Sequence, residues 1–213
     1  MDILLIGATG NIGQRILNEL LDKGYQVTAA QRKPERLNLQ HPHLKIVKGD
    51  LLDTAGLPAL LRDHAVIISA ISPVGGLTPE QFKKANENLI AALQQQPGKR
   101  AIIVGGAGST EVSPGLRVMD SPIMEKLPKE WHPAIYAHAE VLDLYKHSNL
   151  DWTYFSPANH ITPGKRTGQY RLGTINMIFD KGESHISYED YAVALVDEIG
   201  KKQHIRQQFS IGY

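Results

Sequence analysis

The residues best suited to chemistry in this chain are three closely spaced glycines near its start, between a short apolar stretch and an amphipathic one. Glycine lacks a Cβ atom and tolerates positive φ, so the backbone can turn sharply there and approach an anion closely. A helix beginning at this point would direct its free N–H groups at that anion. The pattern therefore predicts a site for the diphosphate of a dinucleotide. Its candidate binding residues are Gly7, Thr9, Gly10, Asn11, Ile12 and Gly13.

The end of the second expected strand bears on which dinucleotide binds. It reads Thr-Ala-Ala-Gln-Arg-Lys over positions 28–33 and contains no carboxylate. NAD-selective sites place an acidic side chain there to bind the ribose hydroxyls, whereas a guanidinium matches a 2′-phosphate. Arg32, aided by Lys33, therefore favours NADP(H), with NAD(H) as the alternative. A solvated basic turn is the simpler interpretation of the same residues.

Further cofactor-binding candidates follow the ends of later strands. Asp50 is expected beside the adenine, although an ordinary turn cap explains it equally well. Gly105 opens a glycine-rich segment against which a flat ring could lie, and Pro157 comes where the chain would flank the nicotinamide. The full set of these candidates is Asp50, Leu51, Ala70, Ile71, Gly105, Pro157 and Ala158.

Alternating strand and helix patterns must position these residues. The expected strands cover residues 3–6, 26–30, 45–47, 65–70, 101–104, 152–155 and 206–211. The expected helices cover residues 12–23, 57–61, 79 to just before Pro97, 134–147 and 188–199. Thr78 with Gln81 forms a capping box for the third helix, and Ser187 can cap the last one. This order predicts an α/β fold with a doubly wound, mainly parallel sheet and helices on both faces.

One domain of residues 1–213 accounts for the chain, with a small C-terminal elaboration at about residues 156–187. Two stretches, 111–133 and 156–173, have no regular pattern and are rich in proline, or in glycine and basic residues. Both follow the carboxyl ends of expected strands, where open α/β sheets bind ligands. We therefore expect them to shape a substrate pocket.

Composition excludes several classes of function. The 213 residues include no cysteine, which excludes disulfides, thiolate metal sites and cysteine nucleophiles. A net charge of +1 and the lack of a long apolar run argue against nucleic acid and membranes as partners. No set of metal ligands has a convincing spacing, so no metal is expected. We expect a cytoplasmic monomer or homodimer.

Several motifs together resemble one protein family. Gly-Ala-Thr-Gly-x-x-Gly at 7–13, Gly-Asp-Leu at 49–51, Val-Gly-Gly-Ala-Gly-Ser at 104–109 and Leu-Asp-Trp-Thr at 150–153 resemble the atypical short-chain dehydrogenases/reductases. Segments 166–173, 186–192 and 204–207 are similar to a subgroup of putative NADH-flavin reductases, related to biliverdin reductase B and to NmrA-like proteins. The resemblance covers essentially the whole chain. It implies a Rossmann-type fold and NAD(P)H binding.

The chain departs from the family at its catalytic pair. Ordinary members carry Tyr and Lys four residues apart on the helix after the fifth strand, and the Lys lowers the pKa of the Tyr. Here the corresponding positions are His132, Tyr136 and Glu140, so the pair is missing in either alignment. Ser109 also lies about two residues from the usual position of the family's catalytic hydroxyl. Carbonyl reduction and sugar epimerisation, which need that pair, are therefore disfavoured.

Hydride transfer to a flavin or a quinonoid acceptor demands less of the protein, because the conjugated acceptor delocalises the incoming charge. Ser109, Tyr136 and His138 are the candidate catalytic residues, with His138 as a proton donor near neutral pH. Aromatic and basic residues expected near the mouth of the site are Trp131, Tyr136, Lys165, Arg166, Tyr170 and Arg171. The leading hypothesis is an NADPH-dependent reductase of flavins or quinone-like compounds. The alternative is a non-catalytic NADP(H) sensor like NmrA.

Overall fold

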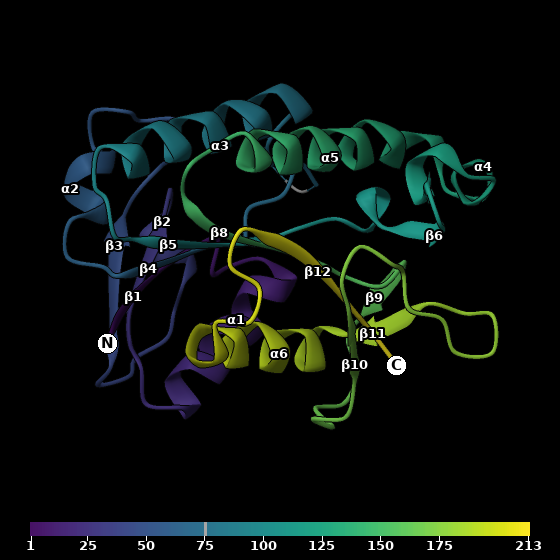
Figure 1. The fold of residues 1–213 in the computed structure, drawn as a ribbon. Coiled ribbons are helices and arrows are strands. Elements are labelled where there is room, and N and C mark those ends of the chain that lie inside the picture. The colour runs from purple at the N-terminus through teal and green to yellow at the C-terminus, as the bar shows by residue number, and fades with distance from the viewer. Residues whose placement is uncertain (75) are drawn as a thin grey trace.

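A central sheet of eight strands, in the order β10-β12-β8-β5-β4-β1-β2-β3, organises the molecule (Figure 1). The structure, a computed structural model, describes residues 1–74 and 76–213. The strands are β1 (Asp2–Ile6), β2 (Gln26–Gln31), β3 (Leu44–Lys48), β4 (Val66–Ser69), β5 (Arg100–Val104), β8 (Asp151–Ser156), β10 (Arg171–Gly173) and β12 (Gln207–Gly212). Neighbouring strands pair in parallel, except that β10 runs antiparallel to β12.

Helices cover both faces of this sheet, as predicted (Figure 1). One layer contains α1 (Asn11–Asp22) and α6 (Tyr188–Lys201), and the other contains α2 (Leu57–Leu61), α3 (Pro79–Gln94) and α5 (His132–Lys146). Successive residues of a strand point to opposite faces. Accordingly, Ile3 and Leu5 of β1 pack with the α1–α6 layer, whereas Leu4 and Ile6 pack with the other layer. None of the described helices is both long and apolar enough to cross a membrane.

The start of α3 forms the predicted capping box. The Thr78 hydroxyl oxygen accepts a hydrogen bond from the Gln81 backbone N–H at 3.2 Å. In return, the Gln81 Oε1 atom accepts one from the Thr78 N–H at 3.0 Å. These bonds satisfy two N–H groups that the first turn of a helix leaves free.

We expect Thr78→Ala to lower the free energy of unfolding by about 1 kcal/mol, because one of these caps is lost. Urea unfolding should show a lower midpoint with an unchanged slope. Thr78→Ser keeps the hydroxyl and should stay close to the wild type. An alanine variant as stable as the wild type would show that the capping box contributes nothing.

The two stretches without a sequence pattern contain short elements. The first holds β6 (Glu111–Ser113), β7 (Leu116–Arg117) and α4 (Ile123–Lys126), and the second holds β9 (His160–Thr162) and β10. β9 pairs in parallel with β11 (His185–Ser187), outside the main sheet. Single 3-10 turns occupy η1 (Pro34–Arg36), η2 (Ala107–Ser109), η3 (Val118–Asp120) and η4 (Lys129–Trp131). Segments of two to four residues are too short to show a periodic pattern, which explains why the sequence did not predict them.

Candidate dinucleotide-binding site

A cavity of about 420 Å³ opens at the carboxyl ends of the strands, where the strand order reverses between β1 and β4. Open α/β sheets bind ligands at such a switch point. Loops after β1, β2, β3, β4 and β5 form most of its wall. The predicted cofactor residues that line the cavity are Gly7, Thr9, Gly10, Asn11, Ile12, Arg32, Asp50, Leu51, Ala70, Ile71 and Gly105.

The three glycines of the first loop have different tasks. Gly7 has a φ of +90°, and a Cβ atom there would lie 2.7 Å from the Ala70 carbonyl oxygen. A Cβ atom on Gly13 would collide with the Gly7 carbonyl oxygen. A Cβ atom on Gly10 would meet only ordinary contact, at 3.5 Å from the Gly7 oxygen. Gly7 and Gly13 therefore allow close backbone packing, whereas Gly10 leaves open space at the cavity wall.

The N-terminus of α1 faces this space without a side-chain cap. Gly10 is the N-cap residue, and its carbonyl accepts the first intrahelical bond from the Gln14 N–H at 2.9 Å. The N–H groups of Asn11 and Ile12 have no hydrogen-bond partner among the described residues, and both residues line the cavity. Free N–H groups at the positive end of a helix dipole form an anion site, which suits the diphosphate of a dinucleotide.

The end of the cavity near β2 and β3 has one cationic side chain, one neutral side chain and one carboxylate that already caps a turn. Arg32 is exposed, and its Nη2 atom lies 3.5 Å from the Gly76 carbonyl oxygen. Gln31 occupies the end of β2 and accepts a hydrogen bond from the Thr9 hydroxyl at 3.2 Å. Asp50 caps a turn by accepting from the Leu52 N–H at 3.0 Å, and it also lines the cavity. The arrangement leaves the Arg32 guanidinium available to a ligand.

The β5 end of the cavity differs from the sequence prediction. Pro157 and Ala158 are buried and do not line the cavity. Ile161 of β9 and Tyr188, the first residue of α6, line it instead. Hydrogen bonding of the short strand β9 beside β11 sets the path of the chain after Ala158. No local pattern in the sequence marks Ile161 or Tyr188 for this place.

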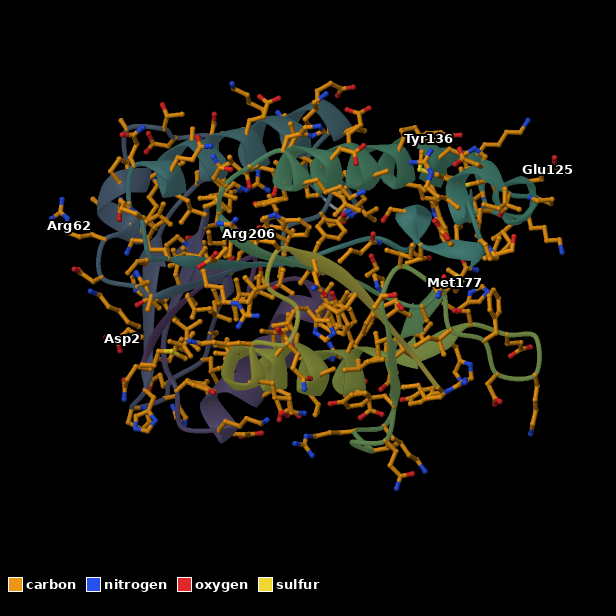
Figure 2. All side chains as sticks on the ribbon, in the orientation of Figure 1. Asp2, Arg62, Glu125, Tyr136, Met177 and Arg206 are labelled. Carbon is orange, nitrogen blue, oxygen red and sulfur yellow. The ribbon has the colours of Figure 1, made fainter. Side chains whose placement is uncertain are left out.

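Two candidate catalytic residues lie away from the cavity wall. The Ser109 hydroxyl accepts a hydrogen bond from Gln208 Nε2 at 2.9 Å, and Ser109 does not line the cavity. Tyr136 is 43% exposed and is labelled on α5 at the end near α4 (Figure 2). Glu140 pairs with Lys83 at 2.8 Å, so it faces α3. Among the described residues, the cavity wall therefore contains no tyrosine–lysine pair from α5.

His138 is the α5 side chain that lines the cavity. The residue is half-buried at the cavity wall, and desolvation of its imidazole lowers the pKa of His138 to about 4. The ring is consequently neutral at pH 7 and lacks the second ring proton that an imidazolium acid would donate. This lowered pKa disfavours the predicted role of His138 as a proton donor near neutral pH, which stays a prediction.

The shifted pKa has a measurable consequence for stability. An unfolded His138 has a pKa of 6.5, so between pH 6.5 and about 4 the unfolded chain binds a proton that the folded chain excludes. Folding stability should therefore fall as the pH falls through this window, by about 2 kcal/mol between pH 7 and pH 5. Urea unfolding of the wild type and of His138→Leu at both pH values measures this term. An equally steep loss in the variant would assign it to other groups.

The basic segment expected near the mouth of the site contacts helices and the C-terminus instead. Arg166 forms two hydrogen bonds of 2.9 Å with the Glu19 carboxylate of α1. The Tyr170 hydroxyl lies 3.4 Å from Asp197 of α6, and Arg171 binds the carbonyl oxygen of Phe179 at 2.8 Å. Lys165 and Trp131 do not line the cavity either. This segment fastens the C-terminal part of the chain and does not line the cavity, so its expected position near the mouth of the site is corrected.

An uncapped helix N-terminus at the switch point of a doubly wound sheet defines a Rossmann-type dinucleotide-binding protein. The chain belongs to the NAD(P)H-binding family, whose sequence model matches residues 7–202.

Similar proteins support this membership. The Bacillus subtilis protein YwnB, itself uncharacterized, is 35% identical over 219 residues, which cover 99% of this chain and 98% of YwnB. A putative epimerase from Bacteroides thetaiotaomicron is 40% identical with a TM-score of 0.91, covering 100% of this chain and 96% of that one. A putative NADH-flavin reductase from Streptococcus pneumoniae is 32% identical with a TM-score of 0.84, covering 100% and 99%.

Proposed function

We propose that this protein is an NADPH-dependent reductase that transfers hydride to a flavin or a similar quinonoid acceptor. When bound, NADPH supplies two electrons and one proton as hydride, the acceptor is reduced, and a second proton comes from water. The observation that carries the proposal is that one continuous cavity is lined by Arg32, by the start of α1 with its free N–H groups, and by His138. The cavity offers an anion site and a wall for a flat ring. At neutral pH the one α5 side chain among its described lining residues, His138, is not an imidazolium that could donate a proton.

The proposed preference for NADPH rests on Arg32. This guanidinium lies at the end of the cavity where NAD-selective proteins place a carboxylate, and the neutral Gln31 stands beside it. A 2′-phosphate matches a guanidinium in charge and geometry.

The protein's part in the proposed reaction is to hold two flat rings together and exclude water. Ile12, Ile161 and Tyr188 line the cavity and offer apolar and aromatic surface to a flat acceptor. Orientation of this kind accelerates a reaction whose acceptor stabilises its own charge.

We do not propose epimerase activity, although one similar protein is a putative epimerase. Epimerisation needs a proton relay, which the described residues of this cavity wall do not offer. We propose a cytoplasmic setting, in which a monomer or homodimer uses reduced cofactor.

The neutral His138 and the missing tyrosine–lysine pair also favour the alternative, an NADP(H) sensor without turnover. NADPH oxidation measured with FMN, riboflavin and a quinone distinguishes the two. Oxidation that depends on an added acceptor supports the reductase. NADPH binding without oxidation across this panel would contradict the reductase and favour the sensor.

A further inference from the structure

Hydrogen bonds around His138 determine which of its ring nitrogens carries the hydrogen. The Tyr154 O–H donates to the His138 backbone carbonyl at 2.7 Å. The same Tyr154 oxygen lies 3.2 Å from Nδ1 of the His138 ring. Because a hydroxyl has one hydrogen, the Tyr154 oxygen can only accept from Nδ1. Nδ1 therefore carries the ring hydrogen, and in a neutral imidazole Nε2 then has only a lone pair.

The packing around His138 holds this ring in one orientation. A Cβ atom on Gly106 would lie 2.9 Å from the Cβ and Cγ atoms of His138, so the glycine lets the ring lie against the backbone. The Phe82 ring covers another side, with its centroid 4.7 Å from that of the imidazole. Burial raises the pKa of Tyr154, so its hydroxyl keeps its hydrogen and the pattern persists across neutral pH.

Nε2 of His138 remains as an acceptor without a partner. Among the described residues, no donor lies within hydrogen-bond distance of it, and it is not one of the buried unpaired atoms. His138 and Gly105 both line the cavity and Nε2 is not fully buried, so we infer that a ligand in the cavity can reach this lone pair. Water can donate to this lone pair in the free protein, and a ligand that displaces that water has to supply a donor in its place.

We propose that His138 Nε2 accepts a hydrogen bond from an amide-type N–H group of the bound ligand, and so positions the reacting ring instead of protonating it. Two ligands carry such a group: the carboxamide of the nicotinamide and the imide edge of a flavin. Only the second case rests on the proposed flavin substrate. The first needs nothing beyond dinucleotide binding in the cavity.

Binding of cofactor analogues tests whether the nicotinamide carboxamide donates this hydrogen bond, and the test needs no catalytic turnover. In 3-acetylpyridine-NADP⁺ a methyl group replaces the NH₂ of the carboxamide and the carbonyl stays. Calorimetry should show that the wild type binds NADP⁺ about tenfold more tightly than this analogue, because one hydrogen bond is lost. His138→Leu should bind the two about equally, with its affinity for NADP⁺ lowered to that of the analogue. Thionicotinamide-NADP⁺ keeps the NH₂ group and serves as the matched control.

The imide edge of a flavin is tested by comparing riboflavin with 3-methylriboflavin as acceptors for the wild type. We expect the wild type to show a higher KM for the methylated flavin, and His138→Leu to show no such difference. This result would identify the flavin as the ligand that donates the hydrogen bond to Nε2. Discrimination in either the cofactor or the acceptor series supports the proposal and names the source.

A direct measurement on the wild type does not depend on a folded variant. Long-range ¹H–¹⁵N NMR spectra of His138 should show a protonated Nδ1 and a bare Nε2, whose resonance moves when the donor-bearing ligand binds. A proton on Nε2 would overturn the proposal, as would equal affinity of the wild type for both cofactors together with equal KM values for both flavins. Failure of the protein to oxidise NADPH would contradict the proposed reductase function. The cofactor-binding and NMR results would still decide whether His138 Nε2 accepts a hydrogen bond from the ligand.

Discussion

Replacing Gly10 with valine is expected to weaken NADPH binding at least about 100-fold while the protein stays folded. The backbone at Gly10 is extended, with φ −74° and ψ 164°, which valine adopts readily. Its side chain would nevertheless fill the open space beside the free N–H groups of Asn11 and Ile12, where the diphosphate must approach. Gly10→Ala places a single methyl group there and should cost about tenfold. Fluorescence titration with NADPH measures both effects.

Two other glycine replacements serve as controls for Gly10. Gly200→Ala lies in α6, where a Cβ atom would meet no atom within 4 Å, so it should bind NADPH normally. Gly13→Ala should instead damage folding, since its Cβ atom would collide with the Gly7 carbonyl oxygen. If Gly10→Val bound NADPH like the wild type, the glycine loop would not be the diphosphate site.

The second large effect is expected at Arg32. Arg32→Glu should weaken NADPH binding about 100-fold, because a carboxylate then opposes the 2′-phosphate. NADH lacks that phosphate, and its affinity should fall less than about threefold or should improve, since an acid can bind ribose hydroxyls. Arg32 is exposed, and among the described residues its side chain has one weak hydrogen bond, to the Gly76 carbonyl, so its replacement should not disturb the fold.

Arg36→Glu makes the same change of charge a short distance along the chain, on a residue that does not line the cavity. It controls for the general loss of positive charge. Equal losses of NADPH and NADH affinity in Arg32→Glu would contradict the proposed preference.

Regular elements and the cofactor loops were predictable because local physics determines them. The apolar run of β1, the capping box at Thr78 and the stop of α1 near Gly24 each follow from residues close together in the chain. The glycine spacing likewise places a turn and a helix start within seven residues. For such features the sequence pattern and the three-dimensional contact coincide.

The β5 end of the cavity depends on packing between distant segments. Tyr136 and His138 are two residues apart on α5, which places them about 200° apart around the helix axis. Which one faces the cavity depends on how α5 packs against α3 and η2, and no local pattern determines this. Arg166 is similar, since its partner Glu19 lies 147 residues away in the chain.

A crystal structure of the protein with NADPH bound is the most direct test of the central claim. The diphosphate oxygens should lie within hydrogen-bond distance of the N–H groups of Asn11 and Ile12, beside Gly10, with the nicotinamide ring toward Gly105 and His138. A nucleotide bound elsewhere, or a cavity that stays empty at saturating NADPH, would contradict it.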